Sequence, residues 1–319
     1  MAETLTYSIG VDLGGTNLRA AAIDTSGKLL KKLSGSTNLR EGRDAVIEDI
    51  VRSIRSLRDE FGATGFHGVG VAVPGFIEME KGLIVGSNNL PAFEGFPVRD
   101  DISQKLGTAV VLENDANAAA LGEKWMGAGR EVNDLVLLTL GTGIGGGIVS
   151  GGRVLHGAVG MAGELGHITV SPFGNPCGCG NTGCLEKHAS ATAVVSMARL
   201  LQLGEDLTSE DVYKIAKGDG DEAAKARHIF EIMGQSLGIA LANLVNTFNF
   251  PLYLLSGGML PAWDLFSPVM LAEVRRRSFT FRNTRTRIEM ATLGNEAGLY
   301  GAAYLPVLDA GRAAATQSS

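Results

Sequence analysis

The amino-acid sequence predicts an α/β protein with two lobes, and three observations lead to this fold class. Short apolar runs typical of buried strands alternate with stretches of helical spacing. A strand, a glycine-rich turn and a second strand occur in YSIGVDLGGTNLRAAA and again in DLVLLTLGTGIGGGIVS. The 319 residues are enough for two domains of ordinary size. We therefore expect each lobe to begin with one of these strand–turn–strand units.

The first lobe is expected to open with three strands joined by tight turns, at 7–13, 18–24 and 28–35. An amphipathic helix is predicted over 45–61, where apolar residues recur at helical spacing and charges occupy the other face. The remaining elements of this half are a strand at 67–75, a short helix at 98–106, a strand at 108–114 and an alanine-rich helix at 116–127.

The second half is expected to repeat the opening arrangement. Its predicted elements are strands at 134–140 and 145–155, helices near 190–203, 208–217 and 222–248, a strand at 251–258, a further helix, a strand at 287–293 and a helix from Glu296. We place the boundary of the lobes near residue 120, inside or just after the helix that follows Asp115. The predicted domains are residues 1–120 joined by the C-terminal helix near 296–308, residues 121–295, and a mobile tail at 309–319.

Charge and apolar patterning exclude several classes of protein. The net charge of −6 argues against a broad surface for nucleic acid or anionic membrane, since either would need clustered Lys and Arg. The start MAETLTYSIGVD has no basic stretch followed by an apolar run, and no uninterrupted apolar run approaches the ~20 residues that span a bilayer. We therefore expect a cytoplasmic protein with no membrane or nucleic-acid partner. The odd number of cysteines makes a disulfide framework an unfavourable interpretation.

The segment GVDLGGTN, at 10–17, predicts a phosphate-binding turn. Backbone amides at Gly14, Gly15 and Thr16 could face one concavity before Asn17, and such a nest binds anions without a basic side chain. Asp12 at the end of the strand could hold a hydrated Mg²⁺, which prefers carboxylate, water and phosphate oxygens. The alternative is a hairpin whose glycines serve only its geometry.

A second glycine-rich turn, GTGIGG at 141–146, has the letters of the dinucleotide fingerprint. A strand follows it, where a dinucleotide-binding fold requires a helix, so we reject that interpretation. Gly141, Thr142 and Gly143 instead fit a second phosphate nest that would face the first. Gly257 and Gly258, in SGGM after the strand PLYLL, form a third glycine-rich strand end, which is weak evidence by itself.

The pair Asn114-Asp115 stands between an apolar strand and an alanine-rich helix. At that position Asp115 could cap the helix, because aspartate is a favoured N-cap residue. It could instead be a carboxylate at the carboxyl edge of a sheet, placed to take a proton from a substrate hydroxyl. The local pattern does not choose between the two.

The three cysteines, Cys177, Cys179 and Cys184, lie within eight positions and are interleaved with glycines. Three thiolates favour zinc, with a fourth ligand completing a tetrahedral site of structural rather than catalytic type. His167 and His188 are both candidates for that ligand, and spacing does not decide between them. The alternatives are three unmetallated thiols or a strained Cys177–Cys179 disulfide.

Polar residues flank this cysteine segment. Glu164 stands three residues before His167, and Glu186 two after the last cysteine. Held rigidly by a metal site, two carboxylates and an imidazole could hydrogen-bond a polyhydroxylated ligand, where each unmade bond costs about 1 to 3 kcal/mol. The alternative for Glu186 is an ordinary surface acid.

Taken in order, these segments resemble the ROK family of sugar kinases and repressors, and within it the bacterial glucokinases. The segments that carry the resemblance are GVDLGGTNLRAA (10–21), VGVAVPG (69–75), NNLP (88–91), ENDANAAALGE (113–123), LTLGTGIGGGIV (138–149), GELGH (163–167), CGCGNTGCLE (177–186), LSGGM (255–259) and LGNEAGLYGAA (293–303). The resemblance implies the actin-like ATPase (ribonuclease H-like) fold, with two lobes, a sugar and ATP in the cleft between them, and a homodimer.

The resemblance also implies a role for each candidate residue. Asp115 matches the general base that takes the proton of the sugar 6-hydroxyl as it attacks the γ-phosphoryl group of ATP. The implied sugar-contacting positions are Asn89, Asn114, Asp115, Glu164, His167 and Glu186. The implied phosphate and nucleotide positions are Gly14, Gly15, Thr16, Asn17, Gly141, Thr142, Gly143, Gly257 and Gly258, with Mg²⁺ accompanying ATP, and Asp12 is grouped with them from its place at the end of the strand. The implied zinc ligands are His167, Cys177, Cys179 and Cys184.

One departure from the glucokinase pattern concerns the substrate. Glucokinases of this family often have tryptophan and then asparagine in the loop after NLP, where this chain has Phe93 and Gly95. We expect ATP-dependent phosphorylation of a hexose, glucose first, with mannose, fructose, N-acetylglucosamine and N-acetylmannosamine as alternatives and polyphosphate as an alternative donor. A sugar-sensing repressor is disfavoured, because nine residues before Gly10 leave no room for a DNA-binding region. A non-catalytic sugar-binding protein is disfavoured by Asp115 and the two phosphate turns.

Overall fold

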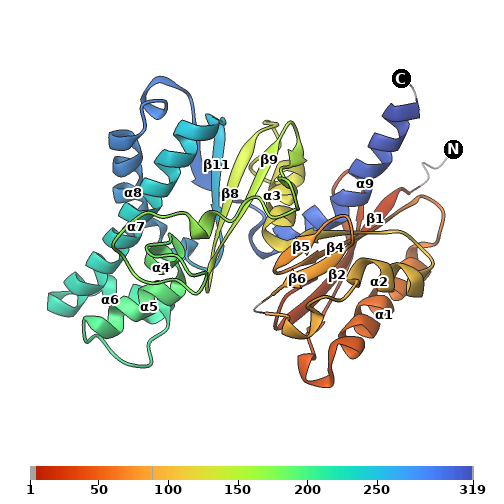
Figure 1. Ribbon diagram of the computed structural model, residues 1–319, viewed down its shortest axis with the longest axis horizontal. Coiled ribbons are helices and arrows are strands. Elements are labelled where there is room, and N and C mark those ends of the chain that lie inside the picture. Colours follow the sequence, from red (N-terminus) through yellow and green to blue (C-terminus); the bar gives the residue numbers. More distant parts are fainter. Residues whose placement is uncertain (1–4, 88, 318–319) are drawn as a thin grey trace. The chain divides into compact units, whose positions relative to one another are not determined.

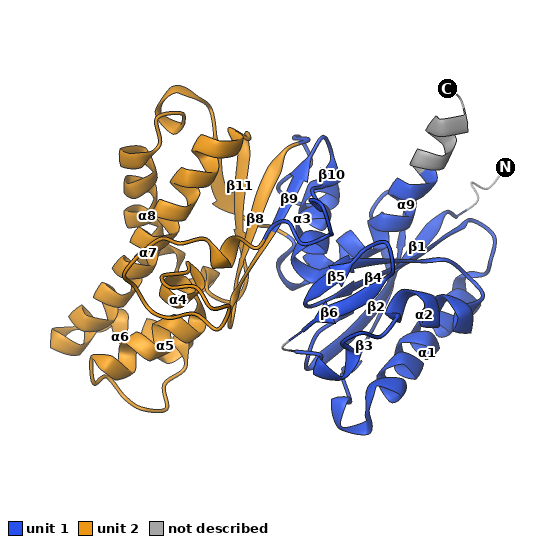
Figure 2. Cartoon of the chain, in the orientation of Figure 1, with its two compact units in different colours: residues 1–133, 147–163, 293–319 blue, residues 134–146, 164–292 orange. Residues whose placement is uncertain are grey.

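The structure is a computed structural model that describes residues 5–87 and 89–317, so Asn88 of the NNLP segment lies outside the described part. The chain divides into two compact units (Figure 2). Unit 1 comprises residues 1–133, 147–163 and 293–319, and unit 2 comprises residues 134–146 and 164–292. The boundary expected near residue 120 would divide helix α3 (Asp115–Met126), whereas the structure keeps this helix whole within unit 1.

Unit 1 is built on a five-stranded sheet in the order β3-β2-β1-β4-β7, of which β1, β2 and β4 are labelled in Figure 1. Its strands are β1 (Tyr7–Leu13), β2 (Asn17–Asp24), β3 (Leu29–Ser36), β4 (Phe66–Val73) and β7 (Val110–Asn114). The first three are antiparallel neighbours, as predicted, and β4 and β7 continue the sheet parallel to β1. A small hairpin of β5 (Phe76–Glu78) and β6 (Leu83–Gly86) was not predicted. The carboxyl ends of β1, β4 and β7 therefore meet at one edge.

Helices cover both faces of this sheet. Helix α1 (Arg43–Phe61) buries Ile47 and Ile50 in a core shared with Ile9 and Val11 of β1. Helix α2 (Val98–Leu106) adds Val98 and Ile102 to the same core. Because side chains alternate along a strand, the intervening position of β1, Gly10, faces the other side.

Helix α9 (Ala297–Gln317) lies against that other face, packing on β1 and β4. A Cβ atom at Gly10 would come within 2.3 Å of the Leu299 carbonyl oxygen, and one at Gly70 within 1.9 Å of that of Ala302. The same helix packs against α3, where Gly301 faces the carbonyl oxygen of Ala118. Glycines thus allow α9 to approach the sheet and α3 closely. The expected mobile tail, 309–319, falls partly within α9, and residues 318–319 lie outside the described part.

The second sheet has the order β10-β9-β8-β11-β12. Its strands are β8 (Leu135–Leu140), β9 (Ile144–Ser150), β10 (Arg153–Val154), β11 (Leu252–Ser256) and β12 (Arg287–Met290). The single strand expected at 145–155 is interrupted at Gly151 and Gly152, which have φ of 58° and 77° and form a turn. The strand expected to continue to residue 293 ends at Met290. Strands β8, β11 and β12 are parallel, as buried βαβ units require.

Helices of unit 2 follow the predicted order. They are α4 (Glu186–Ala189), α5 (Ala191–Leu200), α6 (Ser209–Ala216), α7 (Gly220–Phe248) and α8 (Trp263–Arg277). The described chain also has six short 3₁₀ helices, η1 (Leu39–Glu41), η2 (Pro91–Phe93), η3 (Leu165–His167), η4 (Leu260–Ala262), η5 (Phe281–Asn283) and η6 (Gly294–Glu296). Helix α7 is long and apolar enough to cross a membrane, but 67% of its apolar window is buried, and it packs extensively against α8. These contacts are those of a core helix.

Candidate functional site

The turn between β1 and β2 contains the first proposed phosphate nest. Of its three amides, the one of Gly14 donates to the Asn17 carbonyl oxygen at 2.8 Å, so this N–H closes the hairpin and does not serve as a free donor. The amides of Gly15 and Thr16 remain as the candidate donors of the turn. Asn89 lies against it, since a Cβ atom at Gly15 would be 3.4 Å from the Cβ of Asn89. Unit 1 therefore brings one proposed sugar contact beside one proposed phosphate turn.

Asp12, the proposed magnesium residue, is buried at the end of β1 and ion-paired with Arg19. Burial raises the pKa of Asp12, and the guanidinium of Arg19 opposes this increase. Arg19 also donates from Nη1 to the Asn295 carbonyl oxygen at 2.6 Å. Sequence analysis did not single out Arg19, although it stands directly opposite Asp12 in the β1–β2 hairpin. A magnesium ion at Asp12 would have to share the carboxylate with this arginine.

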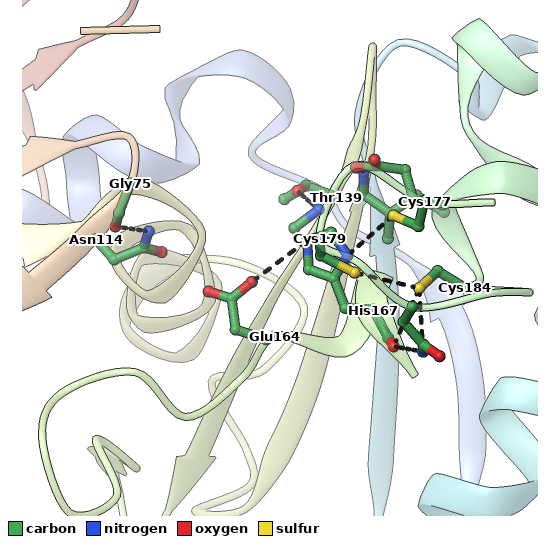
Figure 3. Close-up of polar contacts among 12 residues, drawn as sticks. Gly75, Asn114, Thr139, Glu164, His167, Cys177, Cys179 and Cys184 are labelled. Carbon is green, nitrogen blue, oxygen red and sulfur yellow. Dashed lines mark hydrogen bonds and ion pairs between the residues drawn. The ribbon is translucent and has the colours of Figure 1, made fainter. Parts of the chain in front are cut away.

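The junction of β7 and α3 decides which residue caps the helix. Asn114 is the N-cap residue, because its Oδ1 accepts from the amides of Ala116 at 2.9 Å and Asn117 at 3.2 Å. The Nδ2 of Asn114 donates to the Gly75 carbonyl oxygen at 3.1 Å (Figure 3). The interpretation of Asp115 as the N-cap residue is therefore wrong. Asp115 is the first residue of α3 and stands at the carboxyl edge of the sheet.

The loop after the NLP segment contains Phe93 and Gly95, where the chain departs from the glucokinase pattern. Phe93 is fully buried in the core of unit 1, and the amide of Gly95 donates to the Ile84 carbonyl oxygen at 2.8 Å. Phe93 thus stabilises the loop from inside and does not present its ring at the surface.

Unit 2 brings together the second glycine-rich turn, SGGM and Glu186. The Oε2 atom of Glu186 accepts from the Ile144 amide at 3.0 Å, and a Cβ at Gly143 would be 2.4 Å from the same oxygen. Gly257, with φ of 100°, lies against the Leu140 carbonyl oxygen, which also accepts from the amide of Met259 at 3.2 Å. Thr142 accepts through its carbonyl oxygen from the hydroxyl of Thr192 at 2.7 Å. Glu186 is therefore an anchor of the turn and not a free surface acid.

Glu164 and His167 are held by the short helix η3. The Nε2 of His167 lies 3.9 Å from the Oε2 of Glu164 (Figure 3). Burial raises the pKa of Glu164; His167 opposes the shift, and the nearby Glu186 carboxylate adds to it. A Cβ at Gly166 would come within 2.1 Å of the Ile144 carbonyl oxygen, so η3 packs directly on the start of β9. The two carboxylates and the imidazole thus form one polar group within unit 2.

The cysteine segment forms a cluster with the geometry of a metal site. The ligand atoms of His167, Cys177, Cys179 and Cys184 all lie within 4.8 Å of one another. The Nδ1 of His167 is 3.6 Å from the Sγ of Cys177, and the sulfurs of Cys179 and Cys184 are also 3.6 Å apart (Figure 3). Bond lengths of about 2.0 to 2.3 Å around tetrahedral zinc place ligand atoms about 3.5 to 3.8 Å apart. The donor set and these two distances therefore fit zinc, and the remaining ligand pairs lie within 4.8 Å.

The same geometry decides between the alternatives for this segment. His167 belongs to the cluster, whereas His188 is not one of its members. All three cysteines are free thiols, which rules out the Cys177–Cys179 disulfide in this structure. Because Nδ1 of His167 faces the cysteines and Nε2 faces Glu164, a metal on Nδ1 would fix which ring nitrogen remains for a ligand.

Comparison with known proteins identifies the family. The ROK family model matches residues 8–307. The chain belongs to the ROK family. The actin-like ATPase fold expected from the resemblance is confirmed by solved structures of this family. A ROK hexokinase from Thermus thermophilus is 36% identical, with a TM-score of 0.85 over 95% of this chain and 100% of that one. A ROK glucokinase from Streptomyces griseus in complex with glucose and AMPPNP is 31% identical, with a TM-score of 0.70 over 94% and 98%.

Several ROK relatives are similar over nearly the whole chain. A glucokinase from Thermotoga maritima is 39% identical over 93% of this chain and 96% of its own length. A glucokinase from Halalkalibacterium halodurans is 37% identical over 94% of both chains. A xylose repressor from Caldicellulosiruptor bescii is 31% identical over 94% of this chain and 78% of its own length.

The ROK chain also has functional candidates that sequence reasoning missed. Glu113, directly before Asn114, is a fully buried carboxylate, and His156 contacts it at 2.6 Å. A glutamate at the end of an otherwise apolar strand was the available signal for Glu113. No local pattern indicated His156, because 43 residues separate the two in the sequence.

Proposed function

We propose that this chain transfers the γ-phosphoryl group of ATP to the 6-hydroxyl of a hexose, with glucose as the principal substrate. It is a glucokinase-like sugar kinase, as its ROK relatives named glucokinase and the glucokinase structure with glucose and AMPPNP support. The observation that carries the proposal is the β7–α3 junction. Asp115 stands at the carboxyl edge of the sheet, as the first residue of α3. Since Asn114 is the N-cap residue, the carboxylate of Asp115 is not required for that role.

Asp115 is proposed as the general base. Phosphoryl transfer passes through a loose transition state, so the protein mainly aligns the reactants and stabilises charge. In this proposal the carboxylate of Asp115 accepts the proton of the sugar hydroxyl as its oxygen attacks the phosphorus atom. The amides of Gly15 and Thr16 in unit 1, and the turn from Gly141 to Gly143 in unit 2, would bind phosphate oxygens. Magnesium would neutralise phosphate charge, with Asp12 as its protein ligand.

Sugar recognition is assigned to two sets of polar groups, one within each unit. Asn89 and Asn114 are the proposed contacts in unit 1, and Glu164, His167 and Glu186 those in unit 2. The group in unit 2 is supported by the 3.9 Å approach of His167 to Glu164 and by the rigid anchoring of Glu186. Such preorganised donors and acceptors suit a polyhydroxylated ligand, because unpaired buried polar groups penalise the wrong sugar.

Zinc is proposed as a structural ion bound by His167, Cys177, Cys179 and Cys184. Four protein ligands leave no open position for a substrate, which favours a structural role over catalysis. The ion would hold η3 and the cysteine segment together, and would keep Nε2 of His167 directed toward the sugar side. We also propose a cytoplasmic homodimer, in line with the family resemblance.

A substrate panel tests the proposed function. The chain would be assayed by ADP release with glucose, mannose, fructose, N-acetylglucosamine and N-acetylmannosamine, using ATP with Mg²⁺ as donor and polyphosphate in parallel. We expect the highest kcat/KM with glucose and ATP. Preference for another hexose would correct the substrate, while sugar binding without turnover would favour a sensing role like that of the repressor relatives. The absence of both binding and turnover would overturn the proposal.

A further inference from the structure

A buried carboxylate lies directly beside the proposed base. Glu113, the second-last residue of β7, is 1% exposed and accepts three hydrogen bonds. Its Oε1 accepts from the backbone amide of Asn114 at 2.9 Å and from the Nδ2 of Asn117 at 3.1 Å. Its Oε2 forms a hydrogen bond of 2.6 Å with the Nε2 of His156. Burying a carboxylate costs free energy unless hydrogen-bond partners compensate for the lost water. The three partners of Glu113 provide this compensation.

The two groups bound by Oε1 lie on either side of Asp115. One is the amide of Asn114, which precedes Asp115, and the other is the side chain of Asn117, which is 2% exposed in the first turn of α3. A single oxygen atom therefore ties the end of β7 to the start of α3. The orientation of that carboxylate is in turn set by His156, from the segment after β10.

We propose that Glu113 and His156 are positioning residues for the phosphoryl transfer, which hold the β7–α3 junction so that Asp115 meets the sugar hydroxyl. The inference rests on the proposed function, because it gives Asp115 the role of base. A base must lie within hydrogen-bonding reach of the proton it takes, and misplacement by about 1 Å costs about 100-fold in rate. The imidazole acts through Glu113 and does not itself touch the substrate.

A cavity of about 260 Å³ gives access to this pair from outside the junction. Glu113 and His156 line it, together with Arg153, Leu112, Leu121 and Leu305 of unit 1. The side chain of His156 is 36% exposed, so its removal would enlarge a space that solvent already reaches. Free imidazole could therefore enter the space and donate to Glu113 in place of the missing side chain.

The test compares variants of the pair with a matched control on the same helix. His156→Ala removes the imidazole. Glu113→Gln keeps the shape and one acceptor oxygen, but puts an NH2 group where Oε2 accepts from His156. His156→Gln retains a nitrogen donor. The control is Glu123→Gln. Glu123 is fully buried near the other end of α3 and accepts from the amides of Ala128 at 2.8 Å and Leu293 at 2.7 Å.

We expect His156→Ala and Glu113→Gln to lower kcat about 10- to 100-fold with little change in the KM for hexose. His156→Gln should recover most of kcat, and imidazole should restore His156→Ala but not Glu113→Gln. The Glu123→Gln variant should lose thermal stability while the kcat of the folded protein stays the same. Equal losses in all variants would show a merely structural role and overturn the inference, as would full kcat in His156→Ala.

Amide hydrogen exchange separates this inference from the proposed function. Removing His156 or Glu113 should speed exchange at residues 114–117, whereas Glu123→Gln should leave those amides protected. If the unaltered chain phosphorylates no sugar, the proposed function fails, and the exchange result still shows whether the pair holds the junction. If the unaltered chain is active and Asp115→Asn is inactive while both variants of the pair keep full kcat, only the inference fails.

Discussion

At the residue scale, Asn114 and Asp115 make different contacts at the β7–α3 junction. Asn114 provides the helix cap through Oδ1 and anchors the turn after β4 through its bond to the Gly75 carbonyl oxygen. Asp115 accepts from the Ala116 amide at 2.8 Å through Oδ1. A cap replaced by alanine costs about 0.5 to 2 kcal/mol, so substitutions at these two positions should have different consequences. A change at Asn114 should destabilise the fold, whereas a change at Asp115 should act on the reaction.

The Asp115→Asn variant tests this division. The amide side chain keeps an oxygen for Ala116 and has nearly the same shape, but it cannot take up a proton. We expect kcat to fall by two or more orders of magnitude, a typical effect of losing a general base, with sugar affinity and thermal stability nearly unchanged. Steady-state kinetics and thermal unfolding would measure both.

A control for the lost charge is Asp44→Asn, in the first turn of α1 in the same unit. It should leave kcat as it is. Retention of more than a tenth of the wild-type activity by Asp115→Asn would remove Asp115 from the role of base.

Single residues with chemical patterns were predictable, and their partners were not. The cysteine spacing indicated a metal site from the letters alone, and the structure brings these residues together with His167. Arg19 and His156 were missed because their importance depends on the residue they face. Finding Arg19 requires knowing the register of the β1–β2 hairpin, which puts it opposite Asp12. Finding His156 requires knowing its contact with Glu113, which is 43 positions away in the sequence.

At the scale of elements, the segment from Glu164 to Glu186 has backbone hydrogen bonds between its turns but little regular secondary structure. Its longest helix is the short η3, and its pairing is limited to isolated bridges of Thr169 with Cys184 and Pro176 with Thr182. A four-ligand zinc site contributes folding free energy directly, which would compensate for this scarcity. The metal should therefore matter more here than in a segment with a continuous strand ladder.

Replacing Cys179 by serine tests the role of the metal. Loss of one of four ligands should abolish stoichiometric zinc, lower the Tm and raise the KM for hexose together, because His167 belongs to both groups. Metal content, thermal unfolding and kinetics would be compared with those of Phe173→Ser, a fully exposed position of the same segment. Zinc loss with unchanged KM would separate the metal from sugar recognition.

Elements with strong periodicity were predicted well, and short ones were not. Helix α1 follows from apolar residues at helical spacing, and strands β1, β4 and β8 follow from short, mainly apolar runs. The β5–β6 hairpin was missed because strands of 3 and 4 residues carry too little alternation to be distinguished from a loop. The break between β9 and β10 depends on two glycines in left-handed conformation, which the same letters would also allow inside a strand.

At the scale of the whole molecule, unit 1 is assembled from three separated parts of the chain. Residues 293–319 return to it after all of unit 2, and α9 packs there on β1, β4 and α3. Glycines on both α3 and α9 allow the two helices to pack closely. Gly122 of α3 faces the Ala297 carbonyl oxygen, and Gly301 of α9 faces that of Ala118. The stability of the unit should depend strongly on this contact between sequence-distant helices.

The Gly301→Ala variant measures that dependence. A Cβ there would lie 1.7 Å from the Ala118 carbonyl oxygen, so α9 and α3 would have to separate. Alanine favours an isolated helix by about 1 kcal/mol, but overpacking costs about 1 to 3 kcal/mol or more, and we expect net destabilisation in urea unfolding. In Gly35→Ala the new Cβ meets nothing within 4 Å, and that midpoint should hardly change. Equal midpoints for the two variants would contradict the close packing.

The two-lobed α/β organisation could be predicted from the order of strands and helices, but the extent of each unit could not. Long-range packing decides to which unit β9 and the segment after it belong. For example, Gly147 packs so closely on α3 that a Cβ atom at Gly147 would lie 2.6 Å from the Ala116 carbonyl oxygen. Local patterns carry no information on such long-range contacts.

The late return of α9 has a consequence for synthesis on the ribosome. The strands of unit 1 emerge first, but the face of its sheet that carries Gly10 and Gly70 stays uncovered until residues after 297 have been made. The second sheet is complete once β12 has emerged, before α9 exists. We expect unit 1, which emerges first, to be the last to finish folding. Nascent chains that stop before α9 should expose apolar surface to chaperones.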